Sequence, residues 1–298
     1  MSGLLALDAG SQLGRLDAAA TLGALEEELR PRGLTLGPVP VESRARTLGQ
    51  ALGAPRPSEA TPRGRLVDRC AALDATLADG RAVSTRLAPR KAVGPDVTAA
   101  LLLAAAGAVV IEAAWMRLWR IAEHARCLAF AFAVDEDAGA AALERALGLL
   151  AGGVVPVDLA VVDGSLLARA AAGGAAVAEG EAAVLVRLEG PVALVGAEAA
   201  AATELLGAGR GGGRPLDDDV AAGFLLRRPP LQLAEVMVTG AALSATWRGR
   251  RGPSLLRGQL PERAAFVAAP SDLPPARPLD AGALALLARL RAELGARP

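Results

Sequence analysis

An apolar run from Val97 to Ile111 constrains the fold of this chain more than any other feature. The run has about 15 residues and a glycine divides it, whereas a helix that crosses a membrane needs roughly 20 residues. Asp96 stands directly before the run, where a helix N-cap is expected, and β-branched residues gather at its far end. We therefore predict a buried helix over residues 97–106 and a buried strand over residues 109–118.

The composition indicates a folded chain with an unusual core. The 298 residues provide one large domain or two modest ones, and 52% of them are hydrophobic. Aromatic residues make up only 2%, and tyrosine is absent from the sequence, so Leu, Val and Ala must form the core. The 32 Lys and Arg residues balance the 32 Asp and Glu residues. A nucleic-acid-binding protein usually has a basic excess, so we predict no nucleic-acid partner.

Residues that usually carry catalysis or bind metal are scarce. The two cysteines lack a Cys-x-x-Cys spacing, and His124 is the single histidine, so neither a disulfide framework nor a zinc site is expected. The residues around His124 do not resemble a nucleophile elbow. We assign no catalytic residue and no metal ligand. The N-terminus lacks a basic segment typical of a signal peptide, and a cytoplasmic location without a membrane span is therefore expected.

The N-terminal third alternates strand and helix patterns. Leu22, Leu25 and Leu29 are expected on one helical face, with Glu26 to Glu28 on the other, and Thr21 is a good N-cap. An Ala-Asp-Gly turn at residues 78–80 joins two strand patterns into a hairpin. We predict strands at residues 4–8, 13–17, 67–77 and 81–85, and helices from residue 22 to the turn at residue 31 and over residues 47–52.

A boundary near Arg120 separates this part from the remainder. Beyond it, the order of elements indicates an antiparallel sheet backed by helices, an α+β arrangement. The sequence thus predicts two domains, residues 1–120 and residues 121–298. In the second domain we predict strands at residues 128–134, 154–162, 184–188 and 231–238, and helices at residues 137–150, 192–206, 240–247 and 279–294.

Several sequence blocks occur in the order known from one enzyme family. The stretch Leu87–Trp119 contains Gly94-Pro95-Asp96, then Val110-Ile111, and later Arg117-Leu118. Five shorter blocks precede it: residues 13–26, Arg32-Gly-Leu-Thr-Leu-Gly37, Thr47-Leu-Gly-Gln50, Arg63-Gly-Arg-Leu-Val-Asp68, and residues 77–83. Over residues 4–119 the chain resembles FAD-linked oxidases of the vanillyl-alcohol oxidase or PCMH type. It is most similar there to the alkyldihydroxyacetonephosphate synthase and glycolate oxidase FAD-subunit groups.

The resemblance implies a fold, a cofactor and a set of binding residues. The expected fold is α+β, with the second subdomain of a PCMH-type FAD-binding domain followed by a ferredoxin-like antiparallel α+β cap domain. FAD is the implied cofactor, and Thr47, Gly49, Gly94 and Asp96 are the implied binding residues. The same four residues also suit plain structural roles as helix caps and tight-turn residues.

The family's glycines are largely replaced in this chain. Gln50 occupies the position of the second glycine of T-x-G-G, and Leu103, Ala106 and Val109 occupy those of G-S-E-G-T-L-G. The Gly-rich pyrophosphate loop of the family precedes the blocks found here, and we expect it to be missing. Because a Cβ presses on a closely approaching ligand, the pattern implies that FAD binding is weak or lost.

Three functions fit this pattern. The first is a degenerate, non-catalytic oxidase homologue, acting as a scaffold or as a partner of a complete flavoprotein subunit, or as a homo-oligomer. The second is an active FAD-dependent oxidoreductase of a 2-hydroxy acid or related substrate. The third is a binding module that uses the former flavin cleft for another small molecule. In the third case the cleft would be lined for an anion by Arg44, Arg46, Arg63 and Arg65.

Overall fold

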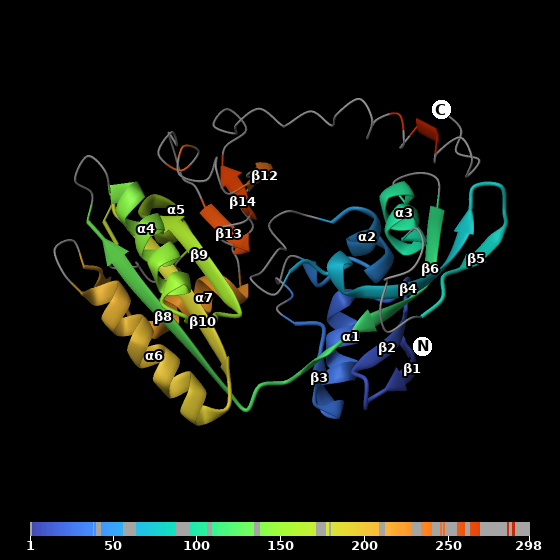
Figure 1. The fold of residues 1–298 in the computed structure, drawn as a ribbon, viewed down its shortest axis with the longest axis horizontal. Helices are drawn as coiled ribbons and strands as arrows, with labels where there is room; N and C mark the ends of the chain where they lie inside the picture. Colours follow the sequence, from blue (N-terminus) through green and yellow to red (C-terminus); the bar gives the residue numbers. More distant parts are fainter. Residues whose placement is uncertain are drawn as a thin grey trace.

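The computed structural model describes most of the chain as two α+β bodies, which follow one another in sequence (Figure 1). The last strand of the first sheet is β6 (Val109–Arg117), and the second body opens with β8 (His124–Phe132). The described residues are 2–37, 39, 43–55, 64–87, 96–105, 109–133, 138–170, 177–178, 180–208, 212–227, 234–239, 245, 247, 255–259, 263–268, 285 and 288–289.

The N-terminal body is a five-stranded antiparallel sheet of order β1-β2-β6-β4-β5. One face packs against three helices over a Leu-rich core that includes Leu16, Leu25 and Met116. A separate pair of two-residue strands, β3 and β7, lies beside it. The elements are β1 (Leu4–Asp8), β2 (Leu13–Asp17), α1 (Leu22–Leu29), β3 (Leu34–Thr35), α2 (Leu48–Gly53), β4 (Cys70–Leu77), β5 (Ala82–Ser84), α3 (Val97–Ala104), β6 (Val109–Arg117) and β7 (Trp119–Arg120).

Local sequence signals explain how the N-terminal elements begin. The Thr21 hydroxyl accepts a hydrogen bond from the Ala24 N–H at 3.2 Å and so caps α1. The predicted strand at residues 67–77 is shorter in the structure, because residues 67–69 form a 3₁₀ turn. The Asp68 carboxylate accepts hydrogen bonds from the backbone N–H and the guanidinium of Arg65, which favours a turn over an extended strand.

The C-terminal body is a seven-stranded antiparallel sheet of order β11-β8-β10-β9-β13-β14-β12. Its described elements are β8 (His124–Phe132), α4 (Ala138–Ala151), β9 (Asp158–Asp163), α5 (Gly164–Ala170), β10 (Ala182–Gly190), α6 (Val192–Gly207), β11 (Arg214–Pro215), α7 (Asp218–Arg227), β12 (Ala234–Thr239), β13 (Leu255–Gln259) and β14 (Arg263–Ala268). The α+β class and the antiparallel cap-like sheet predicted from the sequence are confirmed.

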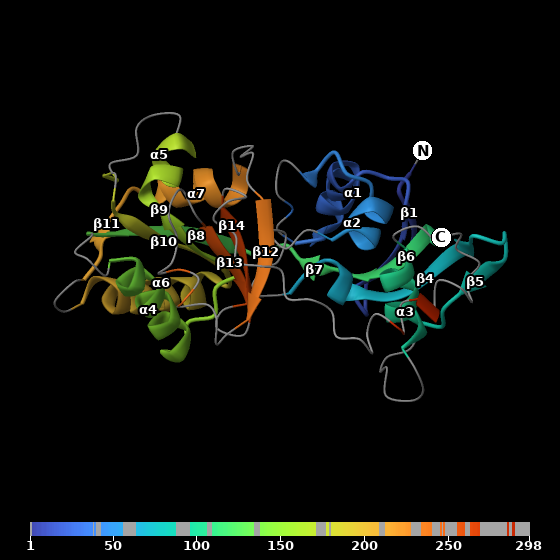
Figure 2. The same cartoon turned by 90° about the horizontal axis from the view of Figure 1, so that it is seen from above.

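Helices cover both faces of this sheet, with α4 and α6 on one side and α5 and α7 on the other (Figure 2). Along β10, Val184 and Val186 enter the core under α4 and α6, while Ala183 and Leu185 enter the core under α5 and α7. A strand buried on both faces must be apolar at successive positions, which accounts for the continuous apolar run of β10.

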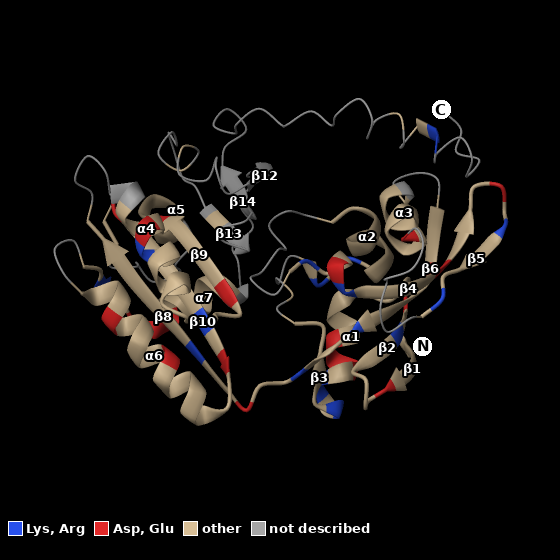
Figure 3. Cartoon of the chain, in the orientation of Figure 1, with Lys and Arg blue, Asp and Glu red and all other residues tan. Residues whose placement is uncertain are grey.

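The sequence prediction did not include α5, α7, β13 and β14, nor the two-residue strands β3, β7 and β11. The predicted helices at residues 240–247 and 279–294 lie almost entirely outside the described residues, where only 245, 247, 285, 288 and 289 are described. Within the part of the chain that the structure describes, no helix is long and apolar enough to cross a bilayer. Basic and acidic residues are interspersed along the described elements of both bodies rather than gathered by sign (Figure 3).

Candidate functional site

A cavity of about 770 Å³ lies in the N-terminal body, between α2, the end of α3, and the strands β2 and β6. This volume is in the range of small-molecule sites. Thr47 and Gly49, two of the four predicted cofactor-binding residues, line it. The remaining lining residues are Asp17, Ala18, Ala19, Arg46, Gln50, Gly53, Ala54, Ala105, Val109, Val110, Ile111 and Glu112.

The chain itself occupies the hydrogen-bond donors at the start of α2. The Leu48 and Gly49 N–H groups donate to the carbonyl oxygens of Ala20 and Ala18, both at 2.9 Å. The Gln50 N–H donates to Thr47 Oγ1 at 3.2 Å, and Gln50 Oε1 accepts from the Thr47 N–H at 3.0 Å, which completes a capping box. An anion bound at this helix start would have to displace these bonds.

Gly49 allows two segments to approach closely. A Cβ built on it would lie 3.3 Å from the Ala18 carbonyl oxygen and 3.4 Å from the Ala18 Cβ. These distances are tighter than most real Cβ contacts, so a side chain at this position would push the segment after β2 away from α2 by a few tenths of an ångström.

The other two predicted residues are placed differently. The Asp96 carboxylate accepts the Ala99 N–H at 3.0 Å and caps the start of α3, whereas Ala105, just beyond the other end of that helix, lines the cavity. Nine residue steps along the helix separate Asp96 from Ala105, which corresponds to about 13 Å. The structure therefore brings Thr47 and Gly49 together but not Asp96. Gly94 lies outside the described residues.

The positions that replace the family's glycines are partly at the cavity. Gln50 and Val109 line it, and Leu103 on α3 has a side chain that is 63% exposed. Ala106 lies outside the described residues.

The charged groups at the cavity are committed to protein partners. Arg46 donates to the carbonyl oxygens of Gln50 and Ala54 at 2.8 and 2.6 Å. Asp17 accepts the Ala19 N–H at 2.8 Å, and Glu112 accepts the Thr76 hydroxyl at 3.1 Å. Two carboxylates and one guanidinium line the cavity, a balance that does not favour a polyanion.

The other arginines predicted for an anion site do not line this cavity. Arg44 pairs with Glu27 at 3.5 Å, and Arg65 pairs with Asp68 at 2.8 Å. Arg63 lies outside the described residues.

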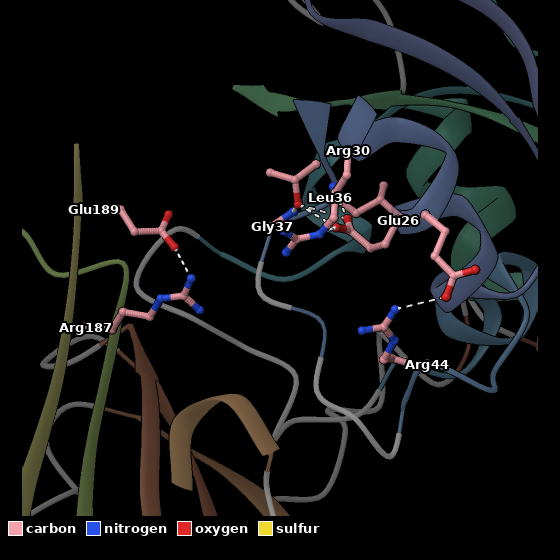
Figure 4. A network of polar contacts seen from close by, with 9 residues as sticks. Glu26, Arg30, Leu36, Gly37, Arg44, Arg187 and Glu189 are labelled. Carbon is pink, nitrogen blue, oxygen red and sulfur yellow. Dashed lines mark hydrogen bonds and ion pairs between the residues drawn. The ribbon is translucent and has the colours of Figure 1, made fainter. Parts of the chain in front are cut away.

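A buried carboxylate, Glu26, organises a second polar cluster beside β3 (Figure 4). Its carboxylate accepts the Leu36 N–H and the Thr35 hydroxyl, and Arg30 approaches at 3.6 Å. Burial raises the pKa of Glu26 above its ordinary value, because desolvation outweighs these hydrogen bonds and the nearby charges. The prediction that Glu26 lies on the exposed face of α1 is wrong, because this side chain is buried. Its position one turn after Leu22 was the signal for the buried face.

The helix cap at the cavity supports a test of stability. Replacing Thr47 with alanine removes the Oγ1 acceptor of the Gln50 N–H and is expected to cost about 1 kcal/mol of unfolding free energy, measured by urea denaturation. Thr203→Ala in α6 is the control, since the Thr203 hydroxyl only bonds back to the Ala199 carbonyl within its own helix and should be close to neutral. Equal losses in the two variants would contradict a capping role for Thr47.

Comparison with known proteins defines the fold of the chain as that of the FAD-linked oxidases. The chain is similar to alkyldihydroxyacetonephosphate synthase, with a TM-score of 0.65 and 14% identity, over 100% of this chain and 62% of that one. It is also similar to p-cresol methylhydroxylase with substrate bound, with a TM-score of 0.61 and 11% identity, over 98% of this chain and 67% of that one.

A third similar structure is 4-ethylphenol oxidase from Gulosibacter chungangensis in complex with isoeugenol, with a TM-score of 0.58, 14% identity, and coverage of 98% of this chain and 69% of that one. No protein-family model and no curated protein matches the sequence. The chain spans less than two thirds of the synthase structure. At these identities the likeness establishes the fold, which agrees with the resemblance read from the sequence blocks.

Proposed function

We propose that this chain is a non-catalytic relative of the FAD-linked oxidases that acts as the structural partner of a complete flavoprotein subunit. The observation that supports this most is the start of α2, where the chain satisfies its own N–H groups and Gln50 completes the capping box. A dinucleotide needs free donors or cations for its pyrophosphate. The described residues at the cavity do not fit that requirement, since Arg46 is engaged and Asp17 and Glu112 add negative charge.

A second candidate is an active FAD-dependent oxidoreductase of a 2-hydroxy acid or a related substrate. The cavity itself favours it, because Thr47 and Gly49 lie together on a volume of about 770 Å³. The third candidate, a module that binds an anion in this cavity, has less support. Among the described arginines proposed for it, Arg44 and Arg65 pair with carboxylates and Arg46 binds helix carbonyls.

Flavin retention distinguishes the first two candidates. The purified chain is incubated with FAD and passed over a gel-filtration column, and the visible absorption of the protein peak is recorded. We expect no flavin in the peak. Retained flavin would overturn the non-catalytic assignment, and oxidase assays with 2-hydroxy acids would then follow.

The proposed association with a complete flavoprotein subunit needs a separate measurement. The tagged chain is isolated from its own cells at native expression level, and the eluate is examined for flavin absorption and for polypeptides in fixed stoichiometry. We expect a second polypeptide that carries flavin. A chain that elutes alone and colourless would contradict a role as a flavoprotein partner.

A further inference from the structure

A second cavity of about 760 Å³ lies at the opposite end of β6. Val109 lines the first cavity and Arg117 lines the second, and the eight residue steps between them correspond to about 26 Å along the strand. The two cavities share no described lining residue. The second is lined by Asp8, Ser11, Gln12, Leu13, Asp68, Arg69, Ala71, Leu87, Arg117, Leu118 and Trp119.

The backbone at one wall of this cavity is strained. Gln12 has a φ of 54°, and among the described residues it is the only non-glycine residue with a positive φ. The Leu118 N–H donates to the Gln12 carbonyl oxygen at 2.8 Å and holds this conformation. A side chain other than glycine in the left-handed region is unfavourable, and such outliers gather at functional sites.

The carboxylates of the cavity have hydrogen-bond partners, whereas two of its donor side chains have none among the described residues. Asp68 is held by Arg65, and Asp8 accepts the Ser11 N–H at 3.0 Å. The Ser11 hydroxyl also bonds to Asp8 and lowers the pKa of that carboxyl. In contrast, within the described part of the chain the side chains of Gln12 and Arg117 make no hydrogen bond or ion pair. The free donors therefore match a ligand that supplies acceptor oxygens.

An aromatic side chain, Trp119, also lines this cavity. Trp119 is half-buried, and a Cβ on Gly37 would lie 3.4 Å from its indole Cδ1 and 3.3 Å from Arg69 Nη1. Gly37 has a φ of 84°, so its backbone passes close to the ring and the guanidinium without a side chain. Leu13, Leu87 and Trp119 give the cavity an apolar side on which a planar group can pack.

We propose that this second cavity binds a small planar carboxylate. The carboxylate accepts hydrogen bonds from the Arg117 guanidinium and the Gln12 amide, and the planar body packs on Trp119 and Leu87. This site is independent of the proposed function, because it shares no lining residue with the first cavity.

Calorimetric titration of the full chain with 2-naphthoate tests the proposal. We expect a dissociation constant of about 1 mM or tighter, and much weaker binding of the neutral analogue 2-naphthamide. Arg117→Gln is expected to weaken naphthoate binding about tenfold. Arg120→Gln is the matched control, since Arg120 is an exposed arginine on the neighbouring strand β7 and does not line the cavity, and it should leave binding unchanged.

A second variant separates binding from stability. Gln12→Gly relieves the left-handed backbone and removes the amide, so it should raise the urea midpoint of unfolding while weakening naphthoate binding. The proposal is overturned if the unaltered chain does not bind naphthoate at millimolar concentration, or if naphthamide binds equally well. It is also overturned if Arg120→Gln weakens binding as much as Arg117→Gln, or if Gln12→Gly leaves binding intact.

Discussion

Replacing Gly164 with alanine is expected to destabilise the C-terminal body by about 3 kcal/mol or more. Gly164 is the first residue of α5, directly after β9, and its N–H donates to the Glu181 carbonyl oxygen at 2.7 Å. A Cβ on it would lie 2.5 Å from that oxygen, 2.7 Å from the Ala178 carbonyl oxygen and 2.9 Å from Val177 Cγ1. Two of these atoms are the backbone carbonyl oxygens of Glu181 and Ala178, so the chain that carries them would have to move away from residue 164.

Gly148 in α4 provides the control for this substitution. A Cβ at that position meets no atom within 4 Å, and the residue lies in a helix interior, so Gly148→Ala should stabilise the protein by about 0.5–1 kcal/mol. Urea denaturation followed by circular dichroism measures both variants. If Gly164→Ala unfolds at the same urea concentration as the unaltered chain, the inference that close contacts around Gly164 exclude a side chain is contradicted.

The sequence predicted the N-terminal body well because its signals are local. Thr21, Thr47 and Asp96 each cap the helix that follows, and each cap requires only three or four consecutive residues. The strands β1 and β2 were predicted with the bounds that the structure shows. These elements form where the local sequence preferences predict them, so tertiary packing only has to stabilise them.

The elements missed in the C-terminal body depend on long-range pairing. β13 contains Arg257 and Gly258 and shows no alternation, but it pairs with β9, about 90 residues earlier, through Leu255 and Val162. The α5 segment borders an Ala-rich tract that reads as compositional, although Leu166 and Leu167 are fully buried in the core under α5 and α7. Such elements form because a neighbouring surface is present, and a local pattern cannot show that.

The candidate sites also differ in whether local sequence signals or long-range contacts define them. Thr47 and Gly49 belong to one short block, so a motif located both of them at the first cavity. The distance of Asp96 from that cavity depends on the direction of α3, which the block does not encode. The second cavity was missed entirely. It combines segments around Gln12, Arg69 and Trp119 that are more than 40 residues apart in sequence, and only the folded sheet brings them together.

The buried Glu26 side chain is also expected to contribute strongly to the unfolding free energy. Replacing it with alanine should cost about 3 kcal/mol, because the buried Leu36 N–H loses its acceptor and a void opens beside β3. Glu27→Ala is the matched control. The Glu27 side chain is 77% exposed and pairs with Arg44 only at 3.5 Å, so its loss should cost less than about 0.5 kcal/mol. Similar losses in the two variants would show that Glu26 does not anchor Leu36.

The pH dependence tests the electrostatic state of the same carboxyl. Since burial raises the pKa of Glu26 in the folded chain, the folded state binds more protons than the unfolded state between the two pKa values. The contribution of Glu26 to stability is therefore complete below its ordinary pKa and is lost as the pH rises through the folded pKa. Hydrogen bonds lower the pKa of Glu28 and Asp74, which gives these groups the opposite slope.

Comparison with Glu26→Gln separates the two slopes, because the variant keeps the other carboxyls and a similar shape. We expect the unfolding free energy of the unaltered chain, minus that of Glu26→Gln, to fall as the pH rises above 4.5, the ordinary pKa of a glutamate carboxyl. Urea denaturation at several pH values measures this difference. A difference that rises with pH would mean that the hydrogen bonds from Leu36 and Thr35 outweigh desolvation. The ionised form of Glu26 would then stabilise the folded chain more than the protonated form does.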